Sequence, residues 1–409
     1  MSRSKSLHVV YLLAGCGGLS LGLKQAGFKT IAYSELNRDA EATFRRNLGG
    51  EADEVGAVTH LTTSRIKDLR SKWGHVDLVC GGPPCQGYSG IGHRRTYKVD
   101  RSQVPSNHLF REMVRVVEAF QPRAFIFENV RGLLSGRWTA DGKSGEIWKE
   151  VRETFGNLNG YEIGWRVLQA KWFGVPQNRP RVILVGVHRE TGLAGAGSES
   201  DPEHNPRGLL PEPLPSSSAP HLVDVLSDLE DPDFSNKRST EHYLVDAQSE
   251  FQRSVRRTKS GRVLAKGARL TEQEYSRHSE RVTAKFVHML EHDGEIPEKM
   301  RTKKFAQRVL PARWKEQGPT ITATSLPDDY VHYKFPRILT VREWARLQTF
   351  PDWFQFEGSR TTGGHRRAGV PSLGIWDREV PKYTQIGNAV PVRMAYHIGK
   401  YLADLLVGA

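Results

Sequence analysis

The sequence predicts an α/β protein with a Rossmann-like sheet, helices on both faces of that sheet, and a smaller mixed domain. Short apolar segments alternate with segments of helical periodicity over residues 7–187. A glycine-rich turn separates the first predicted strand from the first predicted helix, and an acidic residue ends the second predicted strand. This succession of strand, glycine turn, helix and acid-ended strand is typical of doubly wound sheets.

The glycine turn at residues 15–18 lies between a predicted strand at 7–14 and a predicted helix at 19–26. Glycines let a ligand approach the backbone, and a helix N-terminus offers free N–H groups. Glu35 ends the next predicted strand, 31–35, about 20 residues after the glycines, where such folds bind a ribose through its hydroxyls. Together these features predict a site for an adenosine-type cofactor.

The periodicity predicts the remaining elements of the sheet domain. They are helices at 37–47, with Asn37 as N-cap, 108–120 and 147–158, and strands at 57–61, 76–80, 124–130, 161–169 and 182–187, the last two forming an antiparallel pair.

The chain is organised around the predicted strand 76–80, which runs into Gly81-Gly82-Pro83-Pro84 and then Cys85. The two prolines fix φ and remove backbone donors, so the turn is rigid. Open α/β sheets place their chemistry on such turns at the carboxyl ends of strands. Cys85 is therefore either a reactive thiol on this turn or a buried, inert one, as a lone cysteine often is, and the rest of the chain must decide between the two.

Charged residues beyond this turn extend the candidate site. Glu128 closes an otherwise apolar strand, which is costly unless the acid is paired or partly solvated, so it is a candidate working carboxylate or else a structural anchor. Arg179 and Arg181 alternate along an extended segment and point to the same side, which suits an oxygen-rich ligand.

Two basic segments are candidates for nucleic-acid contacts. The long loop 86–107 carries several bases and is interpreted as a lid over the substrate or as a disordered loop. Residues 251–270 hold seven Lys or Arg and no acid, and this favours phosphate contacts over a merely solvated face.

Composition restricts the class of protein. Lys and Arg number 59 against 46 Asp and Glu, a net charge of +13 that favours a polyanionic partner such as nucleic acid. The chain shows no apolar run of membrane-spanning length and no signal peptide, so a cytoplasmic, nucleoid-associated protein is expected. Three cysteines without metal-site spacing predict neither a disulfide framework nor a zinc site.

The 409 residues are expected to form three segments. Residues 1–188 form the catalytic and cofactor-binding domain, 189–336 a linker and target-recognition domain, and 337–409 a return segment that completes the first domain. A helix is expected from about residue 340, with Thr340 as N-cap and Glu343 completing a capping box, and another over 392–406.

These motifs, in this order, resemble the DNA (cytosine-5-)methyltransferase family. The glycine turn resembles its cofactor motif, Pro83-Pro84-Cys85-Gln86 its nucleophile motif, and Glu128-Asn129-Val130 the motif of its catalytic acid. Gln177–Arg181, 337–348 and Gln385–Pro391 resemble its paired-arginine, supporting-helix and last motifs. Only about 190–336, where the family is variable and reads its target sequence, lies outside the resemblance.

The resemblance implies an S-adenosylmethionine-dependent enzyme without a metal, acting on double-stranded DNA, with a cognate restriction endonuclease as a further partner and a monomeric state. The implied catalytic residues are Cys85, Glu128, Arg179 and Arg181. The implied cofactor-binding residues are Ala14, Gly15, Cys16, Gly17, Gly18, Leu19, Glu35, Leu36, Asp68, Pro83, Asn388, Ala389 and Val390. The expected DNA-binding residues are Gln86, Ser89, Arg94, Arg95, Arg253, Arg256, Arg257 and Lys259.

The sequence departs from the family pattern at the cofactor site. Tyr11 and Leu13 replace the acid and the aromatic residue that often flank the cofactor, and Arg65 stands where an adenine-binding acid is expected, with Asp68 as a substitute. These changes bear on cofactor affinity and identity, not on the chemistry at Cys85.

The resemblance also implies a mechanism. The Cys85 thiolate adds to carbon 6 of the cytosine and makes carbon 5 nucleophilic, while Glu128 holds a proton toward ring N3, which requires a raised pKa. Arg181 grips the cytosine O2 and Glu128, and the base must first leave the duplex.

Two alternative functions are considered. The first is an RNA cytosine-5 methyltransferase, although members acting on tRNA have a much smaller variable region. The second is a DNA-binding protein with a degenerate cofactor pocket. Amino-directed methyltransferases are disfavoured because their turn carries an aromatic residue after Pro-Pro.

Overall fold

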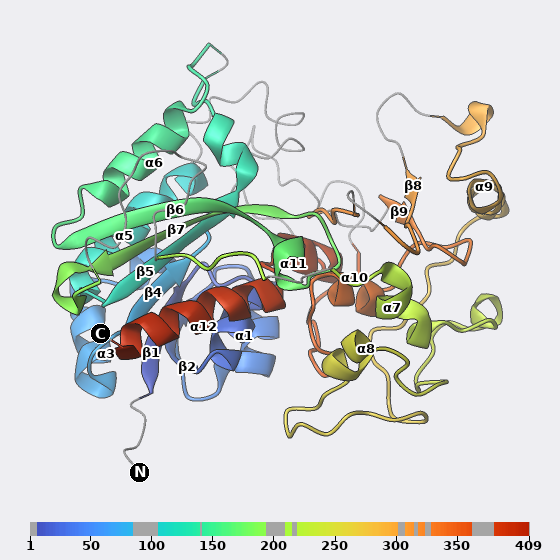
Figure 1. Cartoon of the computed structure of the whole chain (residues 1–409), viewed down its shortest axis with the longest axis horizontal. Coiled ribbons are helices and arrows are strands. Elements are labelled where there is room, and N and C mark those ends of the chain that lie inside the picture. Colours follow the sequence, from blue (N-terminus) through green and yellow to red (C-terminus); the bar gives the residue numbers. More distant parts are fainter. Residues whose placement is uncertain are drawn as a thin grey trace.

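Seven strands form one sheet in the order β3-β2-β1-β4-β5-β7-β6 (Figure 1). The computed structural model describes residues 6–84, 105–139, 141–193, 209–214, 219–301, 307–314, 318–323, 329–361 and 380–408. The strands are β1 (Leu7–Leu12), β2 (Phe28–Ser34), β3 (Asp53–Gly56), β4 (Leu78–Gly81), β5 (Ala124–Val130), β6 (Tyr161–Gln169) and β7 (Pro180–His188).

The first five strands run parallel, and β7 is antiparallel to both of its neighbours. The chain builds β1, β2 and β3 toward one edge and then returns to place β4 on the other side of β1. The strand order therefore reverses between β1 and β4. In open α/β sheets, ligands bind at the carboxyl ends of the strands at such a point.

Helices cover both faces of the sheet, as the sequence predicts. One face carries α1 (Gly18–Gln25), α2 (Arg38–Phe44) and α12 (Val392–Gly408), and the other carries α3 (Thr63–Trp73), α5 (Leu109–Phe120) and α6 (Glu146–Gly156). Val9 and Tyr11 of β1 pack into the first core, whereas Val10 and Leu12 pack into the second. This alternation follows from the period of two in a strand.

One predicted strand is wrong. Residues 57–61 form a single 3-10 turn, Val58–His60, and the third strand is the preceding Asp53–Gly56. The apolar residues of that stretch face the core at Val58 and Leu61, a helical spacing, while the short edge strand is mostly polar. The predicted helix 37–47 also differs in detail, since α2 continues as a π-helix, Arg45–Gly49. Asn37 caps α2 by accepting the N–H of Ala40 at 3.1 Å.

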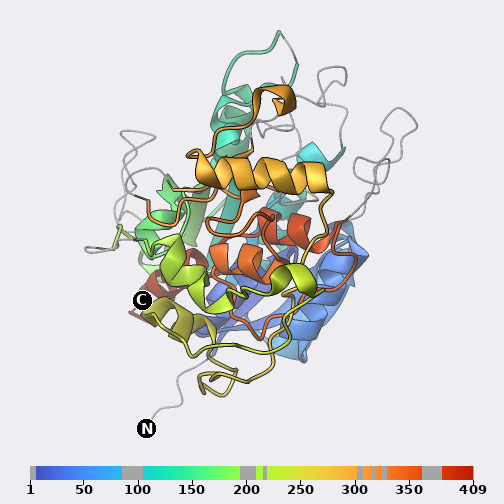
Figure 2. The same ribbon diagram turned by 90° about the vertical axis from the view of Figure 1, so that its right-hand side faces the viewer.

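The helices and strands described between residues 222 and 388 form a second lobe beside the carboxyl edge of the sheet (Figures 1 and 2). It holds α7 (Leu222–Leu226), α8 (Glu250–Val255), α9 (Glu280–Glu291), β8 (Arg308–Val309), β9 (Tyr330–Val331), α10 (Val341–Leu347) and α11 (Lys382–Asn388). Thr340 and Glu343 form the predicted capping box at the start of α10.

The second lobe has two parts that differ in their cores. Buried residues of α7, α8 and α10 belong to the same hydrophobic cluster as β1 and α12. The outer part, with α9, β8 and β9, has a small cluster of its own around Phe286, Met289, Val331 and Ile338. The inner part of the lobe is therefore continuous with the sheet domain through its core, and the boundary at residues 189 and 336 stays a prediction.

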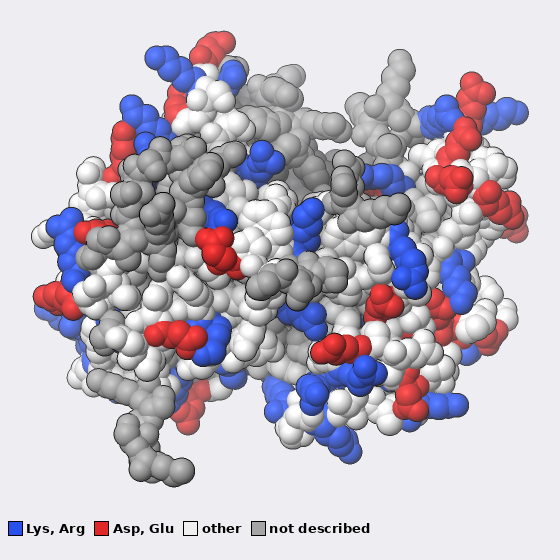
Figure 3. All heavy atoms as spheres, viewed as in Figure 1, with Lys and Arg blue, Asp and Glu red and all other residues white. Residues whose placement is uncertain are grey.

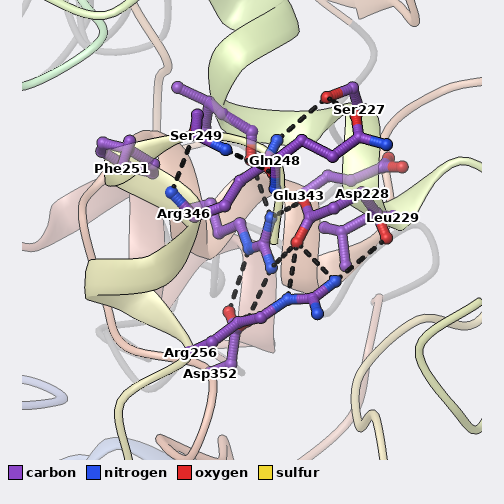
Figure 4. A network of polar contacts seen from close by, with 12 residues as sticks. Ser227, Asp228, Leu229, Gln248, Ser249, Phe251, Arg256, Glu343, Arg346 and Asp352 are labelled. Carbon is purple, nitrogen blue, oxygen red and sulfur yellow. Dashed lines mark hydrogen bonds and ion pairs between the residues drawn. The ribbon is translucent and has the colours of Figure 1, made fainter. Parts of the chain in front are cut away.

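A buried network of charges joins α7, α8 and α10 (Figure 4). Arg346 bonds both Asp228 and Asp352, the latter at 2.6 Å, and Arg256 pairs with Asp228 at 2.7 Å. Arg256 also stacks over the ring of Tyr243 at 3.7 Å and is fully buried. The expectation that Arg256 contacts DNA is therefore wrong, because its side chain is a structural member of this network and cannot reach a phosphate.

Candidate active site at the carboxyl edge of the sheet

The carboxyl ends of β1, β4 and β5 bring the predicted motifs to one edge. Gly81 of β4 lies in register with Leu12 of β1 on one side and Phe127 of β5 on the other. The residues that follow Leu12, Gly81 and Phe127 therefore lie beside one another at the carboxyl ends of their strands. This places the glycine turn, the Pro-Pro turn and Glu128 side by side, as parallel strands require.

Glu128 and Arg181 form a buried ion pair at this edge. The Arg181 Nε lies 2.7 Å from Glu128 Oε1, and the two residues are 6% and 8% exposed. Burial raises the pKa of the Glu128 carboxyl, and the nearby Arg181 and Arg179 guanidiniums oppose the shift without reversing it. Glu128 can therefore hold a proton at a higher pH than an ordinary glutamate.

The turn Gly82-Pro83-Pro84 packs against Glu128 and is hydrogen-bonded to the next residue, Asn129. A Cβ built on Gly82 would lie 2.6 Å from Glu128 Oε2, so only glycine leaves room for the carboxyl. The Asn129 side-chain amide donates to the carbonyl oxygen of Pro83 at 3.1 Å. Sequence reasoning missed both contacts, although Gly82 and Asn129 stand within the two motifs that it singled out.

The structure describes this turn as far as Pro84. Cys85, the expected nucleophile, lies outside the described residues. So do the expected DNA contacts Gln86, Ser89, Arg94 and Arg95. The described part of the turn nevertheless shows the direction in which the chain leaves β4: it passes the Glu128 carboxyl at Gly82 and continues through Pro83 and Pro84.

The glycine turn and Glu35 form a second cradle, at the ends of β1 and β2. The Glu35 carboxylate accepts the N–H of Gly15 at 2.7 Å and that of Asn37 at 2.8 Å. Burial raises the pKa of Glu35, and these backbone donors oppose that shift. Leu36 beside it is 70% exposed, so its apolar side chain is accessible to a ligand in the cradle.

Space above the glycine turn fits a ligand. Gly15 has φ +57°, and a Cβ there would meet no atom of the described residues within 4 Å. An open backbone, a buried acid and an exposed leucine suit the adenosine part of S-adenosylmethionine, whose ribose offers hydroxyls and whose base offers an apolar face. The residues present therefore fit this cofactor.

The last motif returns to the glycine turn, as the resemblance implies. A Cβ on Gly18 would lie 2.4 Å from the carbonyl oxygen of Val390 and 2.9 Å from the Ala389 Cβ. Asn388 is exposed beside them at the end of α11. Residues 388–390 thus close one side of the cradle.

Cys16 and Leu19 lie in this region with their side chains turned into the core. The Cys16 thiol donates to the carbonyl of Gln385 at 3.4 Å, and burial raises its pKa to about 12. Cys16 is therefore not a reactive thiol, and only its backbone can face a ligand in the turn.

Asp68 does not take the place of the missing adenine-binding acid. It lies on the exposed side of α3, half-way along that helix. The end of α3 meets the start of β1, where the rings of Trp73 and His8 lie 6.4 Å apart, so α3 descends from the carboxyl edge toward the amino edge. Arg65 pairs instead with Asp53 at 3.4 Å. The expectation for Asp68 is wrong because the helix carries it away from the cradle.

Tyr11 is a core residue and leaves the cradle unobstructed. It is 1% exposed, donates its hydroxyl to the Ser20 carbonyl at 3.3 Å, and packs edge-on against Phe44. Leu13 adopts a left-handed conformation with φ +56°, and its N–H is held by the Ser34 hydroxyl at 3.1 Å. Tyr11 therefore belongs to the core, and the backbone of Leu13 is tied to β2.

The remaining bases of the 251–270 run lie on the surface. Arg253, Arg257 and Lys259 are exposed, and no carboxylate of the described residues lies within ion-pairing distance of them. Lys259 donates to the Asn47 carbonyl at 3.4 Å and lies over the Trp353 ring. In Figures 1 and 2 this segment is at the lower end of the molecule, whereas β5 and β7 are above it. Figure 3 shows Lys and Arg gathered at that lower end.

Neither a metal centre nor a membrane-crossing helix is found in the described ranges. No three His, Cys, Asp or Glu side chains among them lie so that they could hold a metal ion. No helix among them is both long and apolar enough to cross a bilayer.

Comparison with known proteins agrees with this geometry. The family described as C-5 cytosine-specific DNA methylase matches residues 7–404. The Type II methyltransferase M.DdeI of Desulfomicrobium norvegicum is 30% identical over 414 residues, covering 97% of this chain and 88% of that protein. The Type II methyltransferase M1.HphI of Haemophilus parahaemolyticus is 31% identical, covering 97% and 86%. A structure described as a prophage-encoded DNA modification methyltransferase of Escherichia coli has a TM-score of 0.68 at 25% identity, covering 98% and 99%.

Proposed function

This chain belongs to the C-5 cytosine-specific DNA methylase family, and from that premise we propose that it transfers a methyl group from S-adenosylmethionine to carbon 5 of a flipped-out cytosine in a specific double-stranded DNA sequence. The observation that carries the proposal is the buried Glu128–Arg181 pair seated on the turn Gly82-Pro83. Glu128 is an acid with a raised pKa and lies against Gly82, in the turn that precedes Cys85 in the sequence.

Cys85 is the proposed nucleophile. Carbon 5 of cytosine is a poor nucleophile, and addition of a thiolate at carbon 6 converts the ring into an enamine that reacts at carbon 5. Cysteine suits this role because its thiolate is strongly nucleophilic and can leave again. A free thiol, with a pKa of about 8.5, is only a few per cent ionised at neutral pH, so nearby positive charge must favour the thiolate.

Glu128 is proposed to place a proton at ring N3 as the thiolate adds, which neutralises the charge that develops there. Its raised pKa suits it to hold that proton, and general acid catalysis of this kind contributes about 10²–10⁴-fold. Arg181 fixes the carboxyl at 2.7 Å and is proposed to grip the cytosine O2 with its remaining donors. Once carbon 5 carries the methyl group, a base removes the carbon 5 proton, the Cys85 thiolate is expelled, and the N3 proton returns to the Glu128 carboxylate, which restores the aromatic ring.

Residues of the glycine turn and of the last motif are proposed to hold the cofactor. Glu35 would bind the ribose hydroxyls, Leu36 would cover one face of the adenine, and 388–390 would close the cradle beside Gly18. When bound, S-adenosylmethionine supplies the methyl group as an electrophile on a sulfonium.

The exposed bases Arg253, Arg257 and Lys259 are proposed to contact DNA phosphates. Such contacts bind and position DNA without specifying its sequence. Because this segment lies away from β5 and β7, its contacts would fall on DNA that flanks the target base, and base readers are expected elsewhere in 235–336. Flipping the base costs a few kcal/mol, which phosphate contacts offset.

The biological role is proposed to be modification within a restriction system, with a cognate endonuclease as partner. The support for this role is that the relatives M.DdeI and M1.HphI are named Type II methyltransferases. A monomeric state is proposed with it.

Incubation with S-[methyl-³H]adenosylmethionine and unmethylated plasmid, followed by mapping of modified cytosines, tests the function. The wild type should label carbon 5 of cytosine in one sequence context, and Cys85→Ala should label none while it remains folded. DNA containing 5-fluorocytosine should leave a covalent adduct on the Cys85 peptide. Label at any other atom, or full activity of Cys85→Ala, would refute the proposal.

A further inference from the structure

Arg179 has a different set of contacts from Arg181, although the two residues belong to one motif. Arg181 pairs with Glu128, whereas the Arg179 guanidinium donates to two backbone carbonyls, of Ile321 at 2.7 Å and of Gly387. Arg179 is 4% exposed. Its two acceptors come from segments far apart in the sequence: Ile321 lies between β8 and β9, and Gly387 lies in α11, within the last motif.

The segment around Ile321 is docked along residues 177–179. The N–H of Asn178 donates to the Pro319 carbonyl at 2.8 Å, and the Thr320 hydroxyl donates to the Asn178 carbonyl. The N–H of Ile321 reaches the Gln177 side chain at 3.4 Å. Segment 318–323 leads toward β9 in the outer part of the second lobe, where the target sequence is expected to be read.

The segment around Gly387 leads directly to the cofactor cradle. A Cβ built on Gly387 would lie 2.1 Å from the Thr322 carbonyl oxygen and 2.8 Å from the Ala323 Cα, so the two backbones touch. Three residues later, Val390 meets Gly18 of the glycine turn just as closely. The Gln348 amide donates to the carbonyls of Ile386 and Ala389 at 2.8 and 3.0 Å, which fixes the chain between them.

We propose that Arg179 is a positioning residue that ties the recognition segment 318–323 to the cofactor segment 387–390, so that binding of DNA and binding of cofactor depend on each other. The planar guanidinium spans two carbonyls with separate N–H groups, which a lysine ammonium cannot do in the same geometry. Arg179 thereby sets the distance between the two segments. It does so two positions before Arg181, the arginine that contacts Glu128. This inference rests on the proposed methyl transfer. It assigns to Arg179 a role that is exerted through the two backbone segments that it bridges.

The alternative is that Arg179 touches the substrate. The two roles differ in what a conservative substitution changes. A residue that touches the reacting base changes kcat, whereas one that joins two binding segments changes the affinity for each ligand and the coupling between them.

Two variants test the proposal by different chemistry. Arg179→Lys keeps the buried cation but bridges one carbonyl at most, and Gly387→Ala forces a methyl group against Thr322. Gly156→Ala is the matched control, since the nearest atom to its Cβ would be the Ile163 Cδ1 at 3.5 Å, an ordinary contact. Arg179→Lys alone decides the matter if Gly387→Ala does not fold.

The measurement is the Kd of S-adenosylhomocysteine by calorimetry, with and without a plasmid fragment that the wild type methylates, together with kcat and both KM values. In the wild type and in Gly156→Ala, the fragment should tighten S-adenosylhomocysteine binding about tenfold. In Arg179→Lys and Gly387→Ala that gain should disappear and both KM values should rise about tenfold, while kcat stays within about threefold.

Three results would overturn the proposal: no gain in the wild type, an unchanged gain in Arg179→Lys, or a kcat of that variant lowered about a hundredfold with unchanged KM values. Absence of methyl transfer by the wild type itself would contradict the proposed function instead, so the two failures are distinguishable. A double variant no worse than the more impaired single one would confirm that both changes act on one contact.

Discussion

Glu128 and Glu343 are both buried glutamates that contact an arginine at 2.7 Å, yet their pKa values shift in opposite directions. Glu343 receives four donors: two from Arg337 at 2.7 and 2.8 Å, the N–H of Thr340 at 2.8 Å, and the amide of Gln273 at 3.2 Å. Burial raises the pKa of Glu343, but the charge and hydrogen bonds of Arg337, with the N–H of Thr340, outweigh burial and lower this pKa to about 2. Glu128 has the Arg181 contact and lies against Gly82, and burial prevails.

The difference shows what separates an anchor from a working acid in this fold. A carboxylate with all its lone pairs satisfied is ionised at any physiological pH and ties elements together. A carboxyl that is buried with fewer donors keeps an accessible protonated form, which proton transfer requires. The arginine alone does not distinguish the two glutamates, because both have one.

The largest expected effect is on catalysis at Glu128. Glu128→Gln should lower methyl transfer to plasmid about 10²–10⁴-fold, because the amide cannot deliver the proton. Its melting temperature should fall less than that of Glu343→Gln, because the amide leaves Arg181 without its carboxylate but also removes the cost of ionising a carboxyl whose pKa is raised by burial. Retained activity, measured with labelled S-adenosylmethionine, would show that Glu128 is an anchor like Glu343.

Glu343→Gln is expected to lower the stability of the fold, whereas Glu128→Gln is expected to lower catalysis. Removing this carboxylate leaves the Arg337 charge buried without its partner, which costs about 3–5 kcal/mol of unfolding free energy. Urea unfolding measures the loss, with Glu128→Gln as the matched comparison. A stability within 1 kcal/mol of wild type, on the order of an ordinary surface substitution, would refute the anchor role.

Acid should weaken the fold through Glu343. Its pKa is about 2 in the folded protein and near 4.5 when unfolded, so the unfolded state binds more protons between these values. The stability that Glu343 contributes is complete above about pH 4.5 and is lost as the pH falls toward 2. This contribution is about 3 kcal/mol, because each unit of difference between the folded and unfolded pKa corresponds to about 1.4 kcal/mol. Denaturant titrations from pH 6 down to about 3 should show a shallower fall in Glu343→Gln than in wild type.

Gly82→Ala tests whether the working acid needs its place on the turn. The new Cβ would lie 2.6 Å from Glu128 Oε2, so the carboxyl must move from Arg181. Initial rates should fall about tenfold or more, since misplacing a catalytic group by 1 Å can cost 10²-fold. Gly156→Ala is the control, and equal rates for the two variants would contradict the assignment.

The smallest effect is expected at the surface cations. Replacing both Arg257 and Lys259 by Gln should reduce the slope of log K against log salt for DNA binding by up to about 2, with kcat unchanged. Arg256→Gln in the same segment should instead destabilise the fold, because its partner Asp228 is buried. An unchanged salt slope in the double variant would place the phosphate contacts elsewhere.

Local patterns were sufficient for much of the fold. Apolar runs, glycine turns and caps lie within a few residues of one another, so the capping box at Thr340, the antiparallel pair β6 and β7, and an acid near the carboxyl end of β5 could all be predicted. The neighbourhood of Glu35 and the glycine turn followed from strand spacing.

What the sequence did not reveal depends on contacts between distant segments. Arg256 belongs to a run of bases, and only its burial against Asp228 distinguishes it from its exposed neighbours. Asp68 stands in a plausible stretch, but the direction of α3 takes it away from the cradle. Of the residues that donate to Glu343, Gln273 lies far outside the 337–348 motif, and only the fold brings its amide to the carboxylate.

Glu128 should keep its proton over a pH range in which Glu343 is ionised. Infrared difference titration of wild type against Glu128→Gln and Glu343→Gln isolates the carboxyl stretch of each group. The Glu128 signal of a protonated carboxyl should persist above pH 4.5, whereas that of Glu343 should be absent until the pH falls toward 2. Titration of Glu128 at or below the range of an ordinary glutamate would contradict it.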